Sequence, residues 1–439
     1  MAEAGLKREI GLLDATMIVI SGIIGGGIFF TPATVAQQLP YAGWIMAAWL
    51  VGAVVAYAGA LTFAELGARF PEAGGHYVYI RNAFGLMPAF LYGWMLLLII
   101  ATGALASLAL AFTGYVSGFV PLSPLAQRVL GVLIVLALTL LNILGVKPGA
   151  RTTTVLTVIK VLALLSLIVA GLVMPHTAAG AATLTAPTGR TLFIGFAAAL
   201  VPISFSYGGW QQLNFVAGEI KDAQRRVPAA LALGVGVVAL VYLGANAFYV
   251  RALGPGGMGA SHALAQDATR QLFGETAARL VTVLIAISIL AFSNVVVMVT
   301  PRVFYALGKD GIFLRSLADL HPTFRTPVRA LVLQGVWASV LIMIGNIGML
   351  VNGVVFADWI FFGLGAASLF VFRRRREGDG SYRTPGYPVV PGFFVLAAVI
   401  AVASAIGSYP RESLMGGVLL LAGVALYYGQ RHTGVGKSS

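Results

Sequence analysis

The sequence predicts an all-α integral membrane protein, and three observations carry that prediction. Hydrophobic residues make up 59% of the 439 residues and charged residues only 10%, whereas a typical soluble domain has ~25% charged residues. Surface area grows too quickly with chain size for a soluble core to hide so much apolar surface. The apolar runs are long and continuous, as helices in lipid require, and a transmembrane β-barrel would instead show short alternating segments. A soluble globular protein, a disordered chain and a disulfide scaffold are therefore excluded.

Twelve segments are long and apolar enough to cross a bilayer as helices, which takes ~20 residues each. They are predicted near residues 12–38, 42–66, 84–118, 125–145, 150–174, 191–218, 228–252, 276–308, 328–347, 351–372, 390–408 and 411–430. The first, sixth and eighth are long and interrupted, and the polar stretches between the segments have the length of loops. We therefore expect a single transmembrane domain over residues 1–439.

The distribution of lysine and arginine predicts that both termini lie in the cytoplasm. An even number of spans places the two termini on one side of the membrane. With cytoplasmic termini, 21 of the 28 Lys and Arg residues fall in cytoplasmic segments and six in external ones, while Lys160 lies within a span. This excess follows the positive-inside rule. It also assigns the net charge of +13 to cytoplasmic loops, so nucleic acid is not an expected partner.

Two short stretches are poorly suited to uninterrupted helices in lipid. Residues 21–29 read SGIIGGGIF near the middle of the first span, and residues 204–210 read SFSYGGW near the middle of the sixth. Each glycine weakens a helix by ~1 kcal/mol relative to alanine, and unwound backbone is tolerated at membrane depth only where it lines a cavity or is buried in protein. The two stretches occupy matching places in the halves 12–174 and 191–372. That pattern is typical of an inverted-repeat transporter with discontinuous helices around a midplane site.

The chemistry of two such breaks suits an amino acid. Exposed N–H groups at a half-helix N-terminus attract a carboxylate, and unpaired carbonyl groups at the other half-helix accept hydrogen bonds from an ammonium group. The alternative is close helix packing, because Gly22 and Gly26 form a GxxxG pair that is common in membranes; two breaks at matched positions favour the site. A nucleotide-binding P-loop is excluded because no Gly-Lys-Ser/Thr follows.

Several long motifs, in order along the chain, resemble those of one transporter family. GIIGGGIFFTP at 22–32 resembles a first-helix motif, and SYGGWQQLNFVAGEIKDAQRRVPAAL at 206–231 resembles a sixth helix with its following loop. Further similar motifs are ELGARFPEAGGHYVYIRNAFG at 65–85, PRVFYALGKDGIFLRSLADLHPTFRTP at 301–327, FADWIFFGLGAASLFVFRRRR at 356–376 and YRTPGYPVVP at 382–391. The family is the amino acid–polyamine–organocation superfamily, in its L-amino-acid transporter branch, and the resemblance covers nearly the whole chain.

The resemblance implies a LeuT-type fold of 12 transmembrane helices. In this fold a five-plus-five inverted repeat has broken helices 1 and 6, and two helices within 390–430 are appended. It implies transport by alternating access around the two broken helices. Backbone N–H groups of Gly25, Gly26 and Gly27 are then expected to bind the carboxylate of an L-amino acid substrate.

The resemblance places the ammonium group of the substrate against backbone carbonyls. Those of Ile23, Phe205 and Gly208 are expected to face it, and the ring of Phe205 is expected to cover the pocket. Gln211 either contacts the substrate or orders the unwound backbone. Many members of the family have serine at the position of Gly26, so a hydroxyl contact to the carboxylate is absent here.

Lys160 lies in the middle of the fifth span, and an ionisable residue within the membrane is by default a functional hypothesis. Snorkelling to an interface is the alternative, but Lys160 lies ~15 Å of helix rise beyond Arg151. Backbone carbonyls near Gly22 and the polar groups of Ser293 or Asn294 are its expected partners. The resemblance implies that this lysine stands in for a sodium ion, so that transport is independent of sodium. A role in proton coupling stays open.

Asp358, in the tenth span, is the other ionisable candidate. A gating or structural role, protonation, and a place in the substrate pocket all stay open for it. The third span near 101–108 and the eighth near 291–297 are small or apolar, which favours a neutral substrate side chain. We therefore expect a transporter of neutral L-amino acids that works as an exchanger, a facilitator or a proton-coupled carrier. The alternative is a transporter of cationic amino acids or amines that uses Asp358.

Other classes of function have little support in the sequence. A channel usually repeats a pore motif, and no Ser/His/Asp set, HExxH motif or acidic pair suits an enzyme at membrane depth. The five histidines are scattered and form no metal cluster, and no cofactor is expected. Many animal members of the family pair with a heavy subunit through a cysteine, which this chain lacks. We expect a multi-pass protein of the cell inner membrane.

Overall fold

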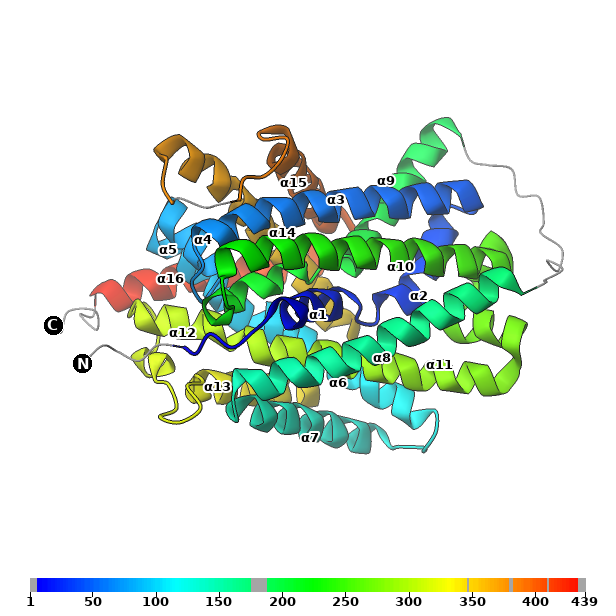
Figure 1. Cartoon of the computed structure of the whole chain (residues 1–439), viewed down its shortest axis with the longest axis horizontal. Coiled ribbons are helices and arrows are strands. Elements are labelled where there is room, and N and C mark those ends of the chain that lie inside the picture. The colour runs from blue at the N-terminus through cyan, green and yellow to red at the C-terminus, as the bar shows by residue number, and fades with distance from the viewer. Residues whose placement is uncertain (1–5, 175–187, 346, 379–381, 409, 433–439) are drawn as a thin grey trace.

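The computed structural model describes residues 6–174, 188–345, 347–378, 382–408 and 410–432. Within these residues the chain is a bundle of helices that run roughly side by side (Figure 1). A parallel bridge between Ile10 and Ile220 is the one β contact of the described residues. The predicted all-α fold is confirmed.

The helices along the chain are α1 (Leu12–Ile23), α2 (Gly27–Gln38), α3 (Ala42–Arg69), α4 (His76–Phe84), α5 (Leu86–Met95), the π-helix η1 (Leu96–Ile100), α6 (Ala101–Ser117), α7 (Pro124–Ile143), α8 (Val146–Val173), α9 (Gly189–Ser206), the 3-10 helix η2 (Trp210–Glu219), α10 (Ala223–Ala260), α11 (Leu264–Val299), α12 (Pro301–Lys309), the 3-10 helix η3 (Arg315–Ala318), α13 (Val328–Ile344), α14 (Ile347–Arg375), α15 (Val389–Ser408) and α16 (Pro410–His432).

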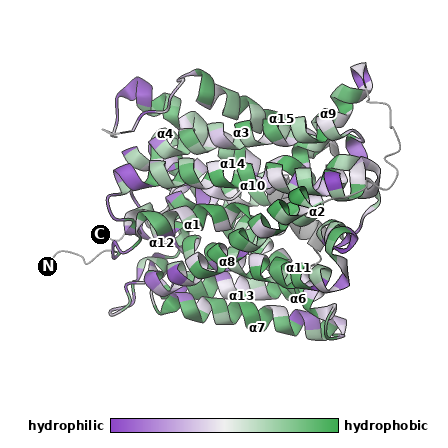
Figure 2. Cartoon of the chain, turned by 45° about the vertical axis from the view of Figure 1, so that its right-hand side comes forward, coloured by the Kyte–Doolittle hydropathy of each residue, from purple (hydrophilic) through white to green (hydrophobic). Residues whose placement is uncertain are grey.

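The described helices have the lengths and composition of membrane spans. Ten are long and apolar enough to cross a bilayer, and the bent pair α1–α2 makes an eleventh candidate. The apolar helix α13 has only 17 residues, so the predicted count of twelve spans stays a prediction, although each predicted segment overlaps a helix. Figure 2 shows hydrophobic residues along the helices and hydrophilic ones gathered at their two ends. The chain is therefore a multi-pass membrane protein.

The end of the bundle at which α1 begins and α16 ends (Figure 1) is called the termini end here. The N–H groups of Glu9 and Ile10 both donate to the carbonyl oxygen of Glu219 at 3.0 Å, and the N–H group of Lys221 donates to that of Ile10 at 3.0 Å. The carboxylate of Glu219 pairs with Arg302, at 2.5 Å between Oε1 and Nε, and both side chains are fully buried. These contacts join the segment before α1 to η2 and to α12.

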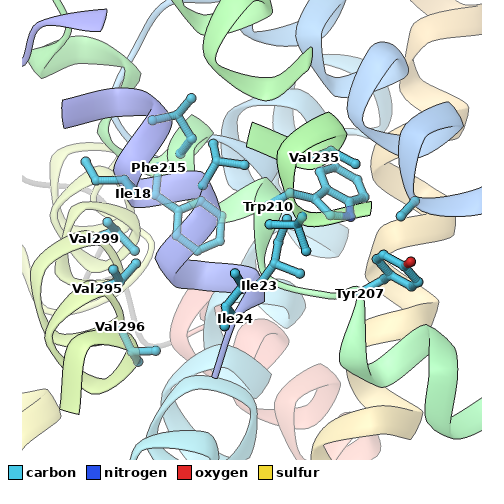
Figure 3. Packing of buried hydrophobic residues seen from close by; sticks show 14 of the residues in the cluster. Ile18, Ile23, Ile24, Tyr207, Trp210, Phe215, Val235, Val295, Val296 and Val299 are labelled. Carbon is cyan, nitrogen blue, oxygen red and sulfur yellow. The ribbon is translucent and has the colours of Figure 1, made fainter. Parts of the chain in front are cut away.

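The first break separates α1 from α2, whose axes are bent by 40°. The three consecutive glycines predicted to weaken the helix lie at this bend, because α1 ends at Ile23 and α2 begins at Gly27. Figure 3 shows the last turn of α1, with Ile23 and Ile24, between valines of α11 on one side and Tyr207 and Trp210 on the other. The break is therefore enclosed by protein and not exposed to lipid.

The second break ends α9 at Ser206, and the chain continues as η2 from Trp210. Between them Gly209 has φ 105°, a left-handed conformation that glycine adopts without strain. The two breaks meet backbone to backbone, because a Cβ atom added to Gly209 would lie 2.0 Å from the carbonyl oxygen of Gly22. Close packing and an unwound site, which the sequence presents as alternatives, are therefore combined at one place.

Replacing Gly209 by alanine is expected to destabilise the protein by about 3 kcal/mol or more, since overpacking and backbone strain each cost about 1–3 kcal/mol. The melting temperature of the detergent-solubilised protein, followed by loss of its monodisperse chromatographic peak, measures the effect. Gly236→Ala in α10 is the control, because nothing lies within 4 Å of a Cβ atom there. Equal melting temperatures for the two variants would contradict the contact between the breaks.

Candidate functional site

A cavity of about 240 Å³ lies beside the two breaks. Its walls come from α1–α2, α5–α6 with η1, α9–η2, α11 and α14. An engineered protein cavity of about 150 Å³ is large enough to bind benzene. The present cavity therefore has room for a small molecule with a sizeable side chain.

The predicted site residues fall into two groups relative to this cavity. All seven residues predicted to contact a substrate line it, namely Ile23, Gly25, Gly26, Gly27, Phe205, Gly208 and Gln211. Asp358 lines it as well, from α14. Lys160 and Ser293, which the sequence predicts beside the site, are not among its lining residues. The contacts that each residue makes to a ligand stay predictions.

The N-terminus of α2 borders the cavity and carries free donors. The N–H group of Gly25 donates to the carbonyl oxygen of Ile23 at 2.8 Å. For the N–H groups of Gly26 and Gly27, the described residues supply no hydrogen-bond acceptor. Unpaired N–H groups at a helix N-terminus, together with the helix dipole, favour an anionic group. This edge of the cavity therefore suits a carboxylate.

The carbonyl groups of the two breaks are only partly occupied. The oxygen of Ile23 accepts a hydrogen bond from the hydroxyl of Tyr242 at 2.9 Å, and the oxygen of Phe205 accepts one from the N–H group of Gly208 at 3.1 Å. A carbonyl oxygen has two lone pairs, so that of Phe205 can accept one more donor. The oxygen of Ile23 also accepts the N–H group of Gly25, so it can take another donor only when the single hydroxyl proton of Tyr242 is donated to Ser206 instead. Phe205 lines the cavity and is 36% exposed; the place of its ring over the pocket stays a prediction.

Tyr242 of α10 joins the two breaks, and no local signal in the sequence marks it. Its fully buried hydroxyl lies 2.9 Å from the carbonyl oxygen of Ile23 and 3.1 Å from that of Ser206. The rings of Trp49 and Tyr207 pack on it with centroids at 5.6 and 5.0 Å. A buried tyrosine needs a partner for its O–H group, but the nearer of the two acceptors here, the carbonyl of Ile23, lies more than 200 positions away in the sequence.

Gln211 orders the unwound backbone, which is one of the two roles that the sequence leaves open. Its side-chain oxygen Oε1 accepts a hydrogen bond from the N–H group of Gly209 at 2.8 Å. The bond satisfies a donor for which the break provides no helical acceptor. The side chain also lines the cavity, so the second role, a contact with substrate, stays a prediction.

Lys160 is fully buried and bonds to the last turn of α1. Its Nζ atom donates to the carbonyl oxygen of Ile24 at 2.5 Å, to Oγ of Ser21 at 3.2 Å and to the carbonyl oxygen of Ser21 at 3.5 Å. These oxygens belong to residues on either side of Gly22, where the sequence predicts partner carbonyls. The lysine therefore satisfies carbonyl groups that the break removes from the helical ladder.

The expected contacts of Lys160 with Ser293 and Asn294 are wrong. Ser293 donates to a carbonyl of its own helix at 2.9 Å, and Asn294 bonds to residues of α7 and α8. The serine of α11 that contacts the first break is Ser288, whose Oγ atom lies 3.0 and 2.9 Å from the carbonyl oxygens of Ile24 and Gly25. Five residues rotate a side chain by about 140° around an α-helix. Ser288 consequently faces the first break and Ser293 does not.

His76 of α4 is fully buried behind the cavity, and neither ring nitrogen has a hydrogen-bond partner among the described residues. The rings of Phe63, Tyr92 and Phe362 surround it at centroid distances of 4.3, 5.6 and 5.6 Å. Burial lowers the pKa of His76 to about 3. The imidazole is therefore neutral in this conformation at physiological pH.

This burial predicts a dependence of stability on pH. The unfolded chain binds a proton at His76 below pH ~6.5 and the folded chain does not, so stability falls by about 1.4 kcal/mol per unit as the pH drops from 6.5 towards 3. His76→Phe is expected to remove this slope and to raise the melting temperature at pH 5 more than at pH 7.5. His262→Gln, at an exposed histidine, is the control. An equal effect of His76→Phe at both pH values would contradict the assignment.

The chain is similar to known membrane proteins over nearly its whole length. Residues 10–425 match a family model described as amino acid permease. The serine/threonine exchanger SteT of Bacillus subtilis is 30% identical over 434 residues, which cover 97% of this chain and 98% of that protein. The b(0,+)-type amino acid transporter 1 of Homo sapiens is 30% identical over 96% of this chain and 88% of its own length. The large neutral amino acids transporter small subunit 2 of Homo sapiens is 30% identical over 96% of this chain and 80% of its own length.

Proposed function

The chain belongs to the amino acid permease family, and from this premise we propose that it is a sodium-independent secondary transporter of neutral L-amino acids. The family and the similar exchangers and transporters are the basis for amino acid transport across a membrane, and not for an enzymatic activity. One observation carries the finer proposal. Free N–H groups of Gly26 and Gly27 and the partly free carbonyl of Phe205 border the same cavity.

In this proposal the substrate is held by backbone atoms of both breaks. Its carboxylate receives hydrogen bonds from the N-terminus of α2, and its ammonium group donates to the carbonyls of Ile23, Phe205 and Gly208. No charged side chain is needed for either group, because the peptide dipoles at the broken helix ends supply the complementary charge. A movement of one break against the other changes both sets of contacts at once, which links binding to alternating access.

The other walls of the cavity support a neutral substrate side chain. They include Ala101 and Ala104 of α6 and Ile289, Phe292 and Val296 of α11. These residues offer an apolar surface and no hydrogen-bonding side chain. Burial of a substrate side chain against them contributes ~25 cal/mol per Å² of apolar area.

Independence of sodium follows from the position of Lys160. Its ammonium group lies among oxygens of Ser21 and Ile24 next to the first break, and these are the hard oxygen ligands that a metal cation would otherwise require. A cationic side chain there supplies a positive charge in place of a metal ion. We therefore infer that no sodium ion is needed to hold the break in shape.

We further infer a location in the cell inner membrane with both termini in the cytoplasm, which rests on the excess of Lys and Arg at the termini side. The 439 residues contain no cysteine, so they cannot form a disulfide to a heavy subunit. The proposed partners are thus an L-amino acid and the lipid bilayer. No cofactor is proposed.

Counterflow in proteoliposomes tests the function. Vesicles are loaded with unlabelled alanine in sodium-free buffer, and the entry of labelled alanine and leucine is followed with empty vesicles as the control. We expect saturable entry that needs an internal amino acid and that does not change when sodium is added. Entry that does not saturate would indicate a channel, and entry that requires sodium would overturn the role inferred for Lys160.

A further inference from the structure

Asp358 places a carboxylate within the cavity. It lies ~16 Å along α14 from the start of the helix and falls within the apolar span Phe356–Arg375. Among the described residues that line the cavity it is the only acidic one, and no Lys, Arg or His is found in that lining. The position is on a different helix from the two breaks, so it is not part of the backbone contacts proposed for the carboxylate and ammonium groups.

The carboxylate of Asp358 has no compensating partner in the described part of the chain. Neither a hydrogen bond nor an ion pair is made to it there. Asp358 is partly buried and faces a largely apolar cavity, where a carboxylate without a donor is stabilised by taking up a proton or by pairing with a cation. A structural role would instead provide a fixed donor, as Arg302 does for Glu219 at the termini end.

The rings around Asp358 suit a cation. Tyr92, Phe205, Phe292, Trp359 and Phe362 all line the same cavity. Trp359 follows Asp358 directly, and its ring meets that of Phe362 edge-on with centroids 5.4 Å apart. Aromatic faces attract ammonium and guanidinium groups, by up to about 2 kcal/mol when water is excluded. The lining therefore combines an uncompensated carboxylate with aromatic rings, the two features that recognise an organic cation.

We propose that Asp358 forms a second polar subsite in the cavity, which binds a proton when the substrate side chain is neutral and binds the side-chain cation of a basic amino acid instead. This inference rests on the proposed function and extends its substrates to amino acids such as lysine. The cavity then carries the same charge whether it holds a neutral amino acid with a proton on Asp358 or a basic amino acid without that proton. A lysine side chain, with an ordinary pKa near 10.4, stays protonated over the range in which the competition is measured.

Competition between a proton and a side-chain cation has a definite pH signature. Raising the pH removes the proton from Asp358, which weakens leucine binding and strengthens lysine binding, each by up to about tenfold per unit for one proton. The other titratable groups that face the site are the phenols of Tyr92 and Tyr115 in the lining. His76 lies behind them, against the rings of Tyr92 and Phe362. His76→Phe is therefore included to separate its titration from that of Asp358.

The experiment measures counterflow of labelled leucine and labelled lysine between pH 5.5 and 8 for the wild type, Asp358→Asn, His76→Phe and Ser107→Ala. Ser107 lines the cavity from α6 and controls for loss of a polar group without charge. We expect leucine and lysine to inhibit each other in the wild type, with opposite pH slopes. Asp358→Asn is expected to lose lysine flux at least tenfold and to keep leucine flux with a flat pH profile.

Three results would overturn the inference while leaving the proposed function intact. They are a wild type in which lysine neither enters nor inhibits leucine, an equal loss of both fluxes in Asp358→Asn, and a pH slope that vanishes in His76→Phe but persists in Asp358→Asn. Absence of leucine counterflow in the wild type would instead remove the proposed function. If Asp358→Asn does not fold, the wild type alone provides the test. The increase in its melting temperature with leucine and with lysine is then measured against pH, and slopes of the same sign for the two ligands would contradict the competition.

Discussion

Replacing Lys160 by methionine is expected to reduce exchange by roughly hundredfold, which corresponds to about 3 kcal/mol. The ammonium group bonds to oxygens of Ser21 and Ile24, and each hydrogen bond to a charged group contributes about 1.5–3 kcal/mol. Methionine fills a similar volume but leaves these carbonyl oxygens buried without a donor. The last turn of α1 then loses the geometry that presents the carbonyl of Ile23 to the cavity.

Counterflow of labelled leucine measures the loss, and the melting temperature separates it from unfolding. Lys147→Met is the matched control, because Lys147 lies in the same helix α8 and is exposed. We expect the control to keep its exchange rate. A Lys160→Met variant that folds and exchanges like the control would contradict the proposed role. A wild type that accumulates leucine in an inward proton gradient, and a variant that still exchanges but no longer responds to that gradient, would instead assign proton coupling to Lys160.

Local sequence signals predicted the parts of the site that depend on composition alone. The glycine run before α2 and the Tyr-Gly-Gly stretch after α9 both weaken a helix regardless of what packs against them, and both lie at breaks in the structure. A lysine within an apolar span must find oxygens, and the nearest broken helix supplies them. The twelve predicted segments likewise correspond to helices because length and hydropathy are properties of each segment separately.

The contacts between distant elements could not be predicted in the same way. Ser293 and Ser288 differ only in rotational phase, since both are small polar residues of α11 and the packing alone decides which one faces the break. The hydroxyl of Tyr242 reaches Ile23 across 219 positions of sequence. Gly22 and Gly209 pack so closely that either Cβ atom would collide with backbone, which depends on the relative placement of two helices.

The buried pair of Glu219 and Arg302 predicts a further large effect, now on the conformational equilibrium. Glu219→Gln leaves the guanidinium group of Arg302 buried without a carboxylate, which typically costs 3–5 kcal/mol. The same residue accepts backbone hydrogen bonds from Glu9 and Ile10, so the pair joins the segment before α1, η2 and α12 at the termini end. We therefore expect Glu219→Gln to favour a conformation in which the cavity opens at that end.

The absence of cysteine from the sequence allows this opening to be measured with a single introduced thiol. Thr300→Cys serves as the reporter, because Thr300 lines the cavity two residues before Arg302 and is only 1% exposed. In this background Glu219→Gln is expected to raise the rate of labelling by a hydrophilic maleimide at least tenfold. Glu72→Gln, at an exposed carboxylate 3.6 Å from Arg81, is the control and is expected to leave the rate unchanged.

The double variant Glu219→Leu with Arg302→Met distinguishes a lost ion pair from a general loss of packing. Removing both charges and keeping the side-chain volume is often neutral for stability, so this variant is expected to recover the melting temperature that Glu219→Gln loses. Because the backbone bonds from Glu9 and Ile10 to residue 219 remain, its labelling rate is expected to return towards that of the reporter alone. A double variant that labels as fast as Glu219→Gln would show that the Glu219–Arg302 charge pair itself holds the termini end closed.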